Sequence, residues 1–238
     1  MLKMLKALKD WEALPGFLRC EEVRPYWEAL RKKRGQLAVK RVLDLLLALV
    51  LLLVLCLPMA VIAVMIRLDS PGPVFYRQER VTAGGKRFFI HKFRTMCVNA
   101  AAVGTAVTAG EDPRITRIGR KLRKVRLDEL PQLLDVLAGD MSFVGTRPEA
   151  VKYTECYRPE WNATLLLPAG ITSECSIRYK DEEKLLAAAA EKGGAEIDRV
   201  YVEEVLPGKM EINLESLRGF SLASDVRTLF RTVLAVVR

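Results

Sequence analysis

The stretch VLDLLLALVLLLVLCLPMAVIAVMI, Val42–Ile66, carries one charged residue, Asp44, among apolar side chains. At ~1.5 Å per residue, a helix of this length can cross the ~30 Å hydrocarbon layer of a membrane. A helix in a soluble core does not need such uniform hydrophobicity. We therefore expect residues 37–67 to form a membrane helix, preceded by a basic, amphipathic extension at 1–36 and followed by a domain at 68–238.

Pro58 interrupts this membrane helix, because proline removes a backbone donor and costs ~3 kcal/mol in a helix interior. Both flanks are basic, and positive residues mark the cytoplasmic side of a membrane. A helix that bends at Pro58 and returns to the same face satisfies both flanks, so we favour a re-entrant helix. The alternative is an ordinary span with a tolerated kink. At the start of the helix, Asp44 is expected to pair with Lys40 or Arg41, one turn away.

Composition narrows the class of protein. The chain has 238 residues and a net charge of +9, which points to a polyanionic partner: nucleic acid, anionic lipid or a phosphorylated small molecule. Its five cysteines are odd in number and lack CxxC spacing, so neither a disulfide framework nor a zinc site is indicated. We expect a reducing, cytoplasmic environment for the domain, and no signal peptide.

Beyond Ile66 the pattern predicts an α+β, mainly helical fold. Val74–Tyr76 and Phe88–Phe93 are expected to be short strands around a turn at Gly84 and Gly85. Further helices are expected at Thr116–Arg126, at Leu130–Leu137 with a stop at Gly139, and at Asp181–Ala190. The first of these should point three side chains inward: Ile118, Leu122 and Val125.

Two segments are predicted to be amphipathic helices. Met1–Leu14 has leucines and a tryptophan spaced among lysines, and the last helix is expected to be capped by Ser224 or Asp225. The last helix carries an apolar stripe of Val226, Leu229, Phe230, Val233, Leu234 and Val237. For both segments two alternatives stay open, packing on the domain or lying in the membrane interface.

The densest group of chemically useful residues is RKVRLDELPQ, Arg123–Gln132. Asp128 and Glu129 follow a run of cations and open a helix, where the dipole favours a carboxylate, so they are expected to stay ionised at neutral pH. One could act as a nucleophile on phosphorus and the other could hold Mg²⁺ beside substrate phosphates. The alternative is an ordinary acidic helix cap beside surface cations.

Two further segments could bind phosphate, namely Lys92–Met96 and Gly145–Pro148, because each places an arginine at the end of an apolar run. His91 is the only histidine of the chain, and a lone histidine is more often structural than catalytic.

A series of motifs in fixed order then resembles the bacterial sugar transferase family, the monotopic polyprenyl-phosphate phosphoglycosyl transferases. Lys40-Arg41 and Asp44 precede the proline-broken helix, and Leu127-Asp128-Glu129-Leu130-Pro131-Gln132-Leu133 holds the carboxylates. The other motifs are Ser70–Tyr76, Gln78–Arg80, Lys92–Met96, Asp112–Gly119, Gly139–Gly145 and Arg147-Pro148, and Pro168–Glu183 is also similar. The compact length is typical of the small form of the family.

The resemblance implies roles for individual residues. Asp128 would be the nucleophile that attacks the β-phosphate of a UDP-sugar, releasing UMP, before polyprenyl (undecaprenyl) phosphate takes the phospho-sugar. Glu129 would help to bind Mg²⁺. Arg94, Arg123 and Arg147 would bind phosphate or nucleotide. The family usually has a proline where this chain has Thr146, so the loop that holds Arg147 is expected to be looser.

The resemblance also implies a place and partners. It makes residues 68–238 a catalytic domain on the cytoplasmic face of the bacterial inner membrane, acting in the first membrane step of glycan synthesis, with membrane lipids but no nucleic acid as partners. A homo-oligomer, the sugar and the pathway stay open. Two other functions are compatible with the sequence: a membrane-anchored binding module that does not depend on Asp128, and a phosphatase that uses water as the acceptor.

Overall fold

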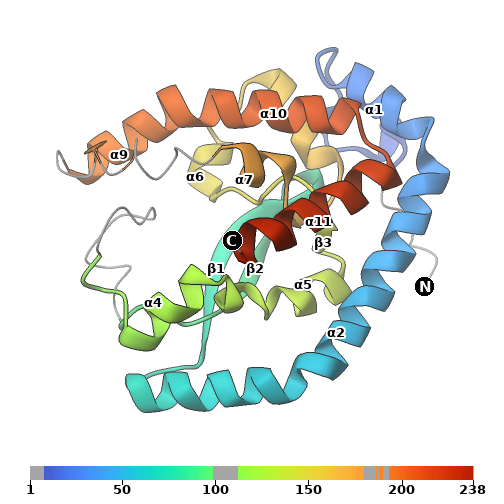
Figure 1. Ribbon diagram of the computed structural model, residues 1–238. Coiled ribbons are helices and arrows are strands. Elements are labelled where there is room, and N and C mark those ends of the chain that lie inside the picture. Colours follow the sequence, from blue (N-terminus) through green and yellow to red (C-terminus); the bar gives the residue numbers. More distant parts are fainter. Residues whose placement is uncertain (1–7, 99–111, 180–185, 187, 190–192, 238) are drawn as a thin grey trace.

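The computed structural model describes residues 8–98, 112–179, 186, 188–189 and 193–237. It is mostly helical with two small sheets (Figure 1), which confirms the predicted α+β, mainly helical fold. The helices are α1 (Arg24–Arg31), α2 (Arg34–Asp69), α4 (Arg117–Lys124), α5 (Gln132–Ala138), α6 (Val151–Thr154), α7 (Glu174–Arg178), α9 (Gly194–Val200), α10 (Leu206–Arg218) and α11 (Leu222–Val237). The strands are β1 (Phe75–Thr82), β2 (Lys86–Phe93), β3 (Met141–Val144) and β4 (Ala169–Thr172).

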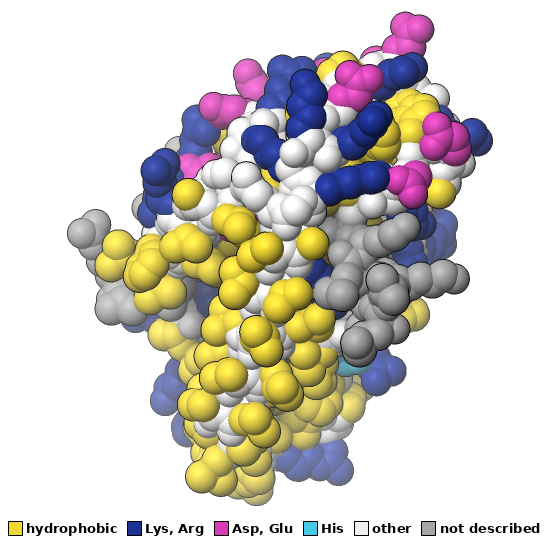
Figure 2. Space-filling model, turned by 90° about the vertical axis from the view of Figure 1, so that its right-hand side faces the viewer, with side chains coloured by type: hydrophobic (Ala, Val, Ile, Leu, Met, Phe, Trp, Pro, Cys, Tyr) yellow, Lys and Arg dark blue, Asp and Glu magenta, His cyan; other side chains and the backbone are white. Residues whose placement is uncertain are grey.

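Helix α2 confirms the predicted long apolar helix. Within the described residues it is the helix that is long and apolar enough to cross a membrane, and only 17% of its most apolar stretch is buried. Pro58 lies inside it, and the helix changes direction along its length (Figure 1). Figure 2 shows the side of the molecule on which α2 lies. Exposed hydrophobic side chains gather on the lower part of this side, with charged side chains above them.

Both ends of α2 pack on the domain. In its first half, Ala48 is buried against β2, β3 and α5. In its second half, Ile62 and Ile66 are buried against β2 and α4. Between them one side of the helix is exposed, since Leu53 and Leu57 keep 68% and 71% of their surface. The other side stays in contact with the domain, because side chains such as Leu55 are partly buried against the same clusters.

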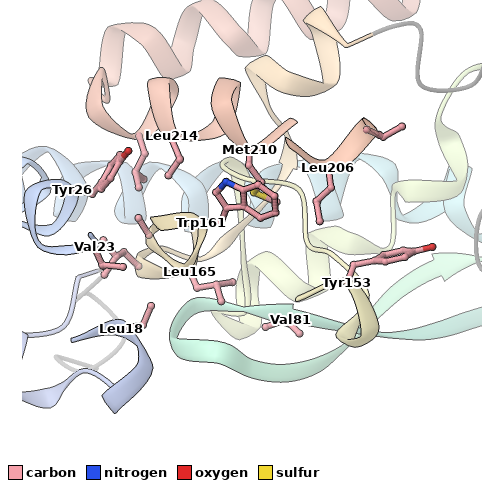
Figure 3. Close-up of a cluster of buried hydrophobic side chains, with 14 of the residues drawn as sticks. Leu18, Val23, Tyr26, Val81, Tyr153, Trp161, Leu165, Leu206, Met210 and Leu214 are labelled. Atoms are coloured by element: carbon pink, nitrogen blue, oxygen red, sulfur yellow. The ribbon is translucent and has the colours of Figure 1, made fainter. Parts of the chain in front are cut away.

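The largest core joins the N-terminal extension to the rest of the chain (Figure 3). Leu18, Val23 and Tyr26 of the extension pack with Trp161 and with the α10 side chains Leu206, Met210 and Leu214. Burial of such side chains contributes ~1.5–3 kcal/mol each relative to exposure, so the extension is an integral part of the fold. The described part of the predicted helix Met1–Leu14 contains only a 3₁₀ turn, Trp11–Ala13.

The predicted β-hairpin is confirmed, and its strands are longer than expected. β1 and β2 pair antiparallel from Phe75↔Phe93 to Thr82↔Lys86. The turn between them contains Gly84 and Gly85, both with φ near +70°, a conformation that suits glycine. The second sheet pairs β3 and β4 in parallel, in the register Ser142↔Gly170.

Helices α4 and α5 bear out most of the predicted helical pattern. Ile118 and Leu122 of α4 are buried as expected, whereas Val125 keeps 41% of its surface, so its predicted inward direction was wrong. The reason is that α4 ends at Lys124, one residue before Val125. Gly139 ends α5 in the left-handed conformation, as predicted.

Helix α11 begins earlier than the sequence suggested. The Ser221 and Ser224 side chains each accept a hydrogen bond from the other residue's backbone N–H, a reciprocal cap that places the start at Leu222 rather than after Ser224 or Asp225. Most of its predicted apolar stripe points outward, because Val226, Phe230, Val233 and Leu234 are all exposed, whereas Leu229 packs on the domain.

Two predictions fall wholly or mostly outside the described residues. These are the loop Ala100–Gly110 and the helix Asp181–Ala190.

Candidate active site

Asp128 and Glu129 lie on a 3₁₀ turn, Leu127–Glu129, in the short connection between α4 and α5. The residue before this turn, Arg126, has φ of 57°, and no other non-glycine residue in the described ranges has a positive φ. A side chain in this region costs of order 1–3 kcal/mol, and such strain clusters at functional sites. Both carboxylates are buried, with Asp128 at 8% exposure and Glu129 at 9%.

Glu129 is held by two cations from different parts of the chain. Arg147 Nη2 lies 2.5 Å and Lys92 Nζ 3.2 Å from Glu129 Oε1. Burial alone would raise the pKa of Glu129, but these two charges hold that pKa far below its ordinary value. Glu129 in turn raises the pKa of Arg147. The pair is ionised at any physiological pH.

Asp128 has the opposite electrostatic character. No ion pair to its carboxylate exists among the described residues. Burial and the neighbouring Glu129 raise its pKa above the ordinary value, while Lys92 and Arg123 oppose that shift. Asp128 is thus a buried carboxylate whose oxygens are not engaged by a partner side chain, beside cations that can receive an anionic substrate.

The hairpin supplies one side of the site. Residues directly opposite each other in an antiparallel pair share a face, and Tyr76 pairs with Lys92 while Arg80 pairs with Phe88. Because side chains alternate along a strand, Lys92 and Arg80 lie on the same face of the hairpin. Burial lowers the pKa of the Lys92 ammonium, and Glu129 opposes that shift.

Arg147 reaches Glu129 from the loop that follows β3. Its Nη1 also lies 3.4 Å from the carbonyl of Ile171, next to the end of β4. Backbone hydrogen bonds hold this loop at Thr146, where it was predicted to be loose. Gly170 N–H donates to the Thr146 carbonyl at 2.8 Å, and Gly145 N–H donates to the Thr172 carbonyl at 3.0 Å. The expected loosening at Thr146 is therefore not reflected in the backbone hydrogen bonds.

Arg123 and Arg94 occupy different surroundings. Arg123 Nε donates to Thr95 Oγ1 at 2.9 Å, and its guanidinium lies within electrostatic reach of Asp128. Arg94 is only 5% exposed, and its two terminal nitrogens donate to the carbonyls of Pro71 and Ser70, both at 2.7 Å. It also approaches the Ile66 carbonyl at 3.4 Å, so the structure places Arg94 as a clamp on the C-terminal end of α2.

The polar residues at the start of α2 bind the domain and not one another. Asp44 accepts hydrogen bonds from Ser142 Oγ at 2.7 Å and from Phe143 N–H at 3.3 Å. Lys40 donates to Asp225 at 2.5 Å, and Arg41 Nη1 lies 3.4 Å from the Met141 carbonyl. No ion pair joins Asp44 to Lys40 or Arg41 among the described residues, so the predicted pairing one turn away was wrong. Tertiary partners on β3 and α11 replaced the local ones.

Sequence reasoning did not single out several residues around the site. Glu149 and Lys209 form a buried ion pair of 3.0 Å, and Lys92, rather than Arg94, is the cation of its motif that contacts a carboxylate. Side chains two residues apart in a strand lie on the same face, so the sequence pattern could not tell whether Lys92 or Arg94 contacts the carboxylate. His91 is structural as expected, because its Nδ1 lies 2.6 Å from the buried Asp135.

A cavity of about 340 Å³ lies elsewhere, between the start of α2, the end of β3, α10 and α11. Its lining includes Lys40, Asn213 and Thr228 but neither Asp128 nor Glu129. In the described part of the chain no cluster of three or more His, Cys, Asp or Glu residues could hold a metal by itself.

Comparison with known proteins gives a consistent picture. The family model described as bacterial sugar transferase matches residues 35–238. A Bacillus subtilis protein, provisionally named an undecaprenyl-phosphate N-acetylgalactosaminyl 1-phosphate transferase, is 47% identical over 54% of this chain and 72% of its own length. The exopolysaccharide production protein PSS of Rhizobium leguminosarum is 36% identical over 84% of this chain and 95% of its own.

Other relatives are longer than this chain. The UDP-glucose:undecaprenyl-phosphate glucose-1-phosphate transferase of Escherichia coli is 35% identical over 82% of this chain but only 39% of its own length. The matched region in every case includes most or about half of this chain, whereas the share of the relative varies widely.

Proposed function

This chain belongs to the bacterial sugar transferase family, and from that premise we propose that it transfers a sugar-1-phosphate from a UDP-sugar to undecaprenyl phosphate. The observation that carries the proposal is the site itself. Asp128 is a buried carboxylate without an ion-pair partner in the described chain, next to a Glu129 that is held by Arg147 and Lys92.

The proposed reaction has two steps with an aspartyl intermediate. An Asp128 carboxylate oxygen attacks the β-phosphorus of the UDP-sugar, the bond from that phosphorus to the bridging oxygen breaks, and UMP leaves with the electron pair. A phosphate oxygen of undecaprenyl phosphate then attacks the same phosphorus. The acyl-phosphate bond breaks, Asp128 is regenerated as a carboxylate, and the product is an undecaprenyl-diphosphate-sugar.

The surrounding charges suit this substrate. Lys92, Arg123 and Arg147 are positioned to neutralise the diphosphate, which otherwise repels the attacking carboxylate. Glu129 keeps Arg147 and Lys92 in place, so the cations are preorganised rather than recruited on binding.

The donor set also fits Mg²⁺ in the way this ion is usually bound. Mg²⁺ takes one or two protein carboxylates and completes its shell with substrate phosphates and water. Glu129 Oε2, with Arg147 Nη1 at 3.5 Å as its hydrogen-bond partner, is the less engaged oxygen and would hold the ion with Asp128 nearby. A bound Mg²⁺ would supply charge stabilisation for the phosphates and the leaving group.

We also propose that α2 is re-entrant and that the domain lies on the cytoplasmic face of the bacterial inner membrane. The extension before α2 and the domain after it share one core, so both lie on one side of any membrane that α2 enters. This supports the predicted bend at Pro58 over a span. The free cysteines and the basic flanks favour the cytoplasmic side.

Helix α11 is proposed to lie in the membrane interface. Its polar positions, including Asp225, Thr228 and Arg231, line the cavity beneath it, while Phe230 and Val233 point away and are 68% and 61% exposed. A soluble protein places these faces the other way round. An apolar face toward lipid explains the inversion.

The deciding experiment is UMP release by the purified protein from a panel of UDP-sugars, with undecaprenyl phosphate and Mg²⁺. The panel includes UDP-N-acetylgalactosamine and UDP-glucose, since relatives carry both names. Asp128→Asn is expected to abolish release. The control Glu28→Gln changes a carboxylate in an exposed pair with Arg24 on α1 and should retain activity.

Incubation without lipid should leave a phospho-sugar on Asp128 that intact-protein mass spectrometry detects and hydroxylamine removes. UMP release that continues without lipid would instead indicate a phosphohydrolase. A folded protein that releases no UMP with any sugar, or an Asp128→Asn variant that keeps full activity, would overturn the proposal.

A further inference from the structure

A second buried charge cluster lies behind the site. Lys209 of α10 contacts Glu149 Oε1 at 3.0 Å, and Tyr201 donates its hydroxyl hydrogen to Glu149 Oε2 at 2.8 Å. Lys209 also donates to the Tyr201 hydroxyl at 2.7 Å. The three side chains, here called the Glu149 triad, form a closed ring of contacts in which each carboxylate oxygen has its own donor.

The triad is buried. The side chains of Lys209 and Glu149 are each only 9% exposed. Tyr201 stacks on Tyr153 with ring centroids 4.2 Å apart, and it begins a π-helical turn, Tyr201–Val205, between α9 and α10. π-Helical turns are rare overall, and those that occur are often found at functional sites. Two buried charges cost several kcal/mol each to desolvate, so a cluster of this kind needs an explanation beyond packing.

Glu149 links the triad to the proposed site through the backbone. It follows Arg147 by two residues, with Pro148 between them. Its carbonyl accepts a hydrogen bond from Val81 N–H at 3.1 Å, next to Arg80 on β1. The position of Glu149 therefore fixes the loop that carries Arg147 against the strand that carries Arg80.

Glu149 also attracts both arginines without binding either. Its charge raises the pKa of Arg147 and counteracts the burial that lowers the pKa of Arg80. Yet no ion pair joins Glu149 to Arg147 or Arg80 among the described residues, because both of its oxygens are directed to Lys209 and Tyr201. Arg147 is left to Glu129.

We propose that Lys209 and Tyr201 are positioning residues for Arg147. By engaging the Glu149 carboxylate they prevent it from capturing Arg147, so the guanidinium stays turned toward Glu129 and available to the diphosphate of the donor. This inference rests on the proposed function. It adds that Lys209 and Tyr201, some sixty residues from Arg147 along the chain, help to determine the affinity for the UDP-sugar donor.

Removal of Lys209 tests this directly. In Lys209→Met, the buried Glu149 lacks its cation, and Arg147 and Arg80 are cations that its charge already reaches. We expect the KM for the UDP-sugar and the Kd for UDP, measured by calorimetry, to rise about tenfold, with a smaller change in kcat. Adding Glu149→Gln to this variant should restore both constants, because a neutral amide does not compete for Arg147. Lys209→Arg should also retain them.

The matched control is Lys86→Met, which removes a lysine from the ion pair with Asp140 near the hairpin turn, where the lysine side chain is 62% exposed. A Lys209→Met variant whose thermal stability falls while KM and UDP affinity match those of Lys86→Met would show a purely structural role and overturn the inference. Failure of Glu149→Gln to restore affinity would do the same. Failure of the proposed function is distinct, since it removes UMP release from the wild type.

Discussion

Two neighbouring carboxylates in this protein have opposite electrostatic settings. Glu129 is stabilised as an anion by Arg147 and Lys92, and its pKa is held down. Asp128 is buried beside that anion, and its pKa is raised. A carboxyl whose folded pKa is raised favours folding while it is protonated, and this contribution is lost as the pH rises through the folded pKa. Asp128 therefore destabilises the protein at neutral pH.

Asp128→Asn is accordingly expected to raise the apparent Tm at pH 7 while it abolishes turnover. A gain of roughly 1 kcal/mol would shift the Tm of a chain of this size by about 2–4 °C, and the gap to wild type should close toward about pH 4. Differential scanning fluorimetry across pH measures this. Glu129→Gln is the matched control and should lower the Tm, because it leaves Arg147 and Lys92 without their anion. An Asp128→Asn Tm at or below wild type at pH 7 would contradict the account.

Arg94 gives a second prediction at the level of a single residue. Its guanidinium holds the Ser70 and Pro71 carbonyls and the Ser70 hydroxyl at 2.9 Å, which a lysine ammonium cannot match in geometry. Arg94→Lys should cost roughly 2–3 kcal/mol of stability, with the KM for the UDP-sugar unchanged in the folded fraction. Arg147→Lys should show the reverse, a raised KM with little loss of Tm. A raised KM in Arg94→Lys would instead make Arg94 a donor ligand.

At the scale of elements, the exposed stripe of α11 is the observation behind its proposed place in the membrane interface. Phe230→Trp should place an indole in lipid, and brominated lipids in proteoliposomes should quench its fluorescence. Ala235→Trp lies on the opposite side of the helix and is exposed, so it should be quenched much less. The three native tryptophans contribute equally to both variants. Equal quenching at both positions would remove α11 from the interface.

The same scale shows what the sequence alone could predict. Strong local signals were reliable: the uniform apolar run gave α2, the Gly84-Gly85 turn between alternating residues gave the hairpin, and Gly139 gave the end of α5. The Asp128-Glu129 site could be proposed from the sequence because its key residues are adjacent along the chain, and its role stays a prediction.

Partners far apart along the chain escaped prediction. Asp44 contacts Ser142 instead of the arginine one turn away, and Glu149 pairs with Lys209. Neither contact produces a periodic pattern in the sequence. Long-range contacts also decided the described part of the N-terminal extension, where Leu8 and Leu14 were equally compatible with a membrane surface and with the core that they enter. Such choices depend on which surface the folded chain offers, and this is not encoded in spacing.

At the scale of the whole molecule, the core constrains the topology of α2. Lys33, just before α2, donates to the Phe220 carbonyl at 2.5 Å, and Leu30 is fully buried in the core that contains α10. A spanning α2 would put residues 8–33 and residues 70–237 on opposite sides of the bilayer. It would then expose the apolar surface that joins them, which costs ~25 cal/mol of free energy per Å². The shared core therefore supports the proposed re-entrant α2, which requires both ends of the helix to lie on one side.

This requirement is testable in cells. Glu22→Cys is exposed before α2, and the native Cys156 is exposed after it. A membrane-impermeant maleimide added to intact spheroplasts should label neither, and the same reagent added after lysis should label both. Labelling of Glu22→Cys but not Cys156 in intact spheroplasts would mean that α2 spans the membrane in the cell. In that case the core joining Leu18 to Met210 could not form, and the fold of the extension would have to change with it.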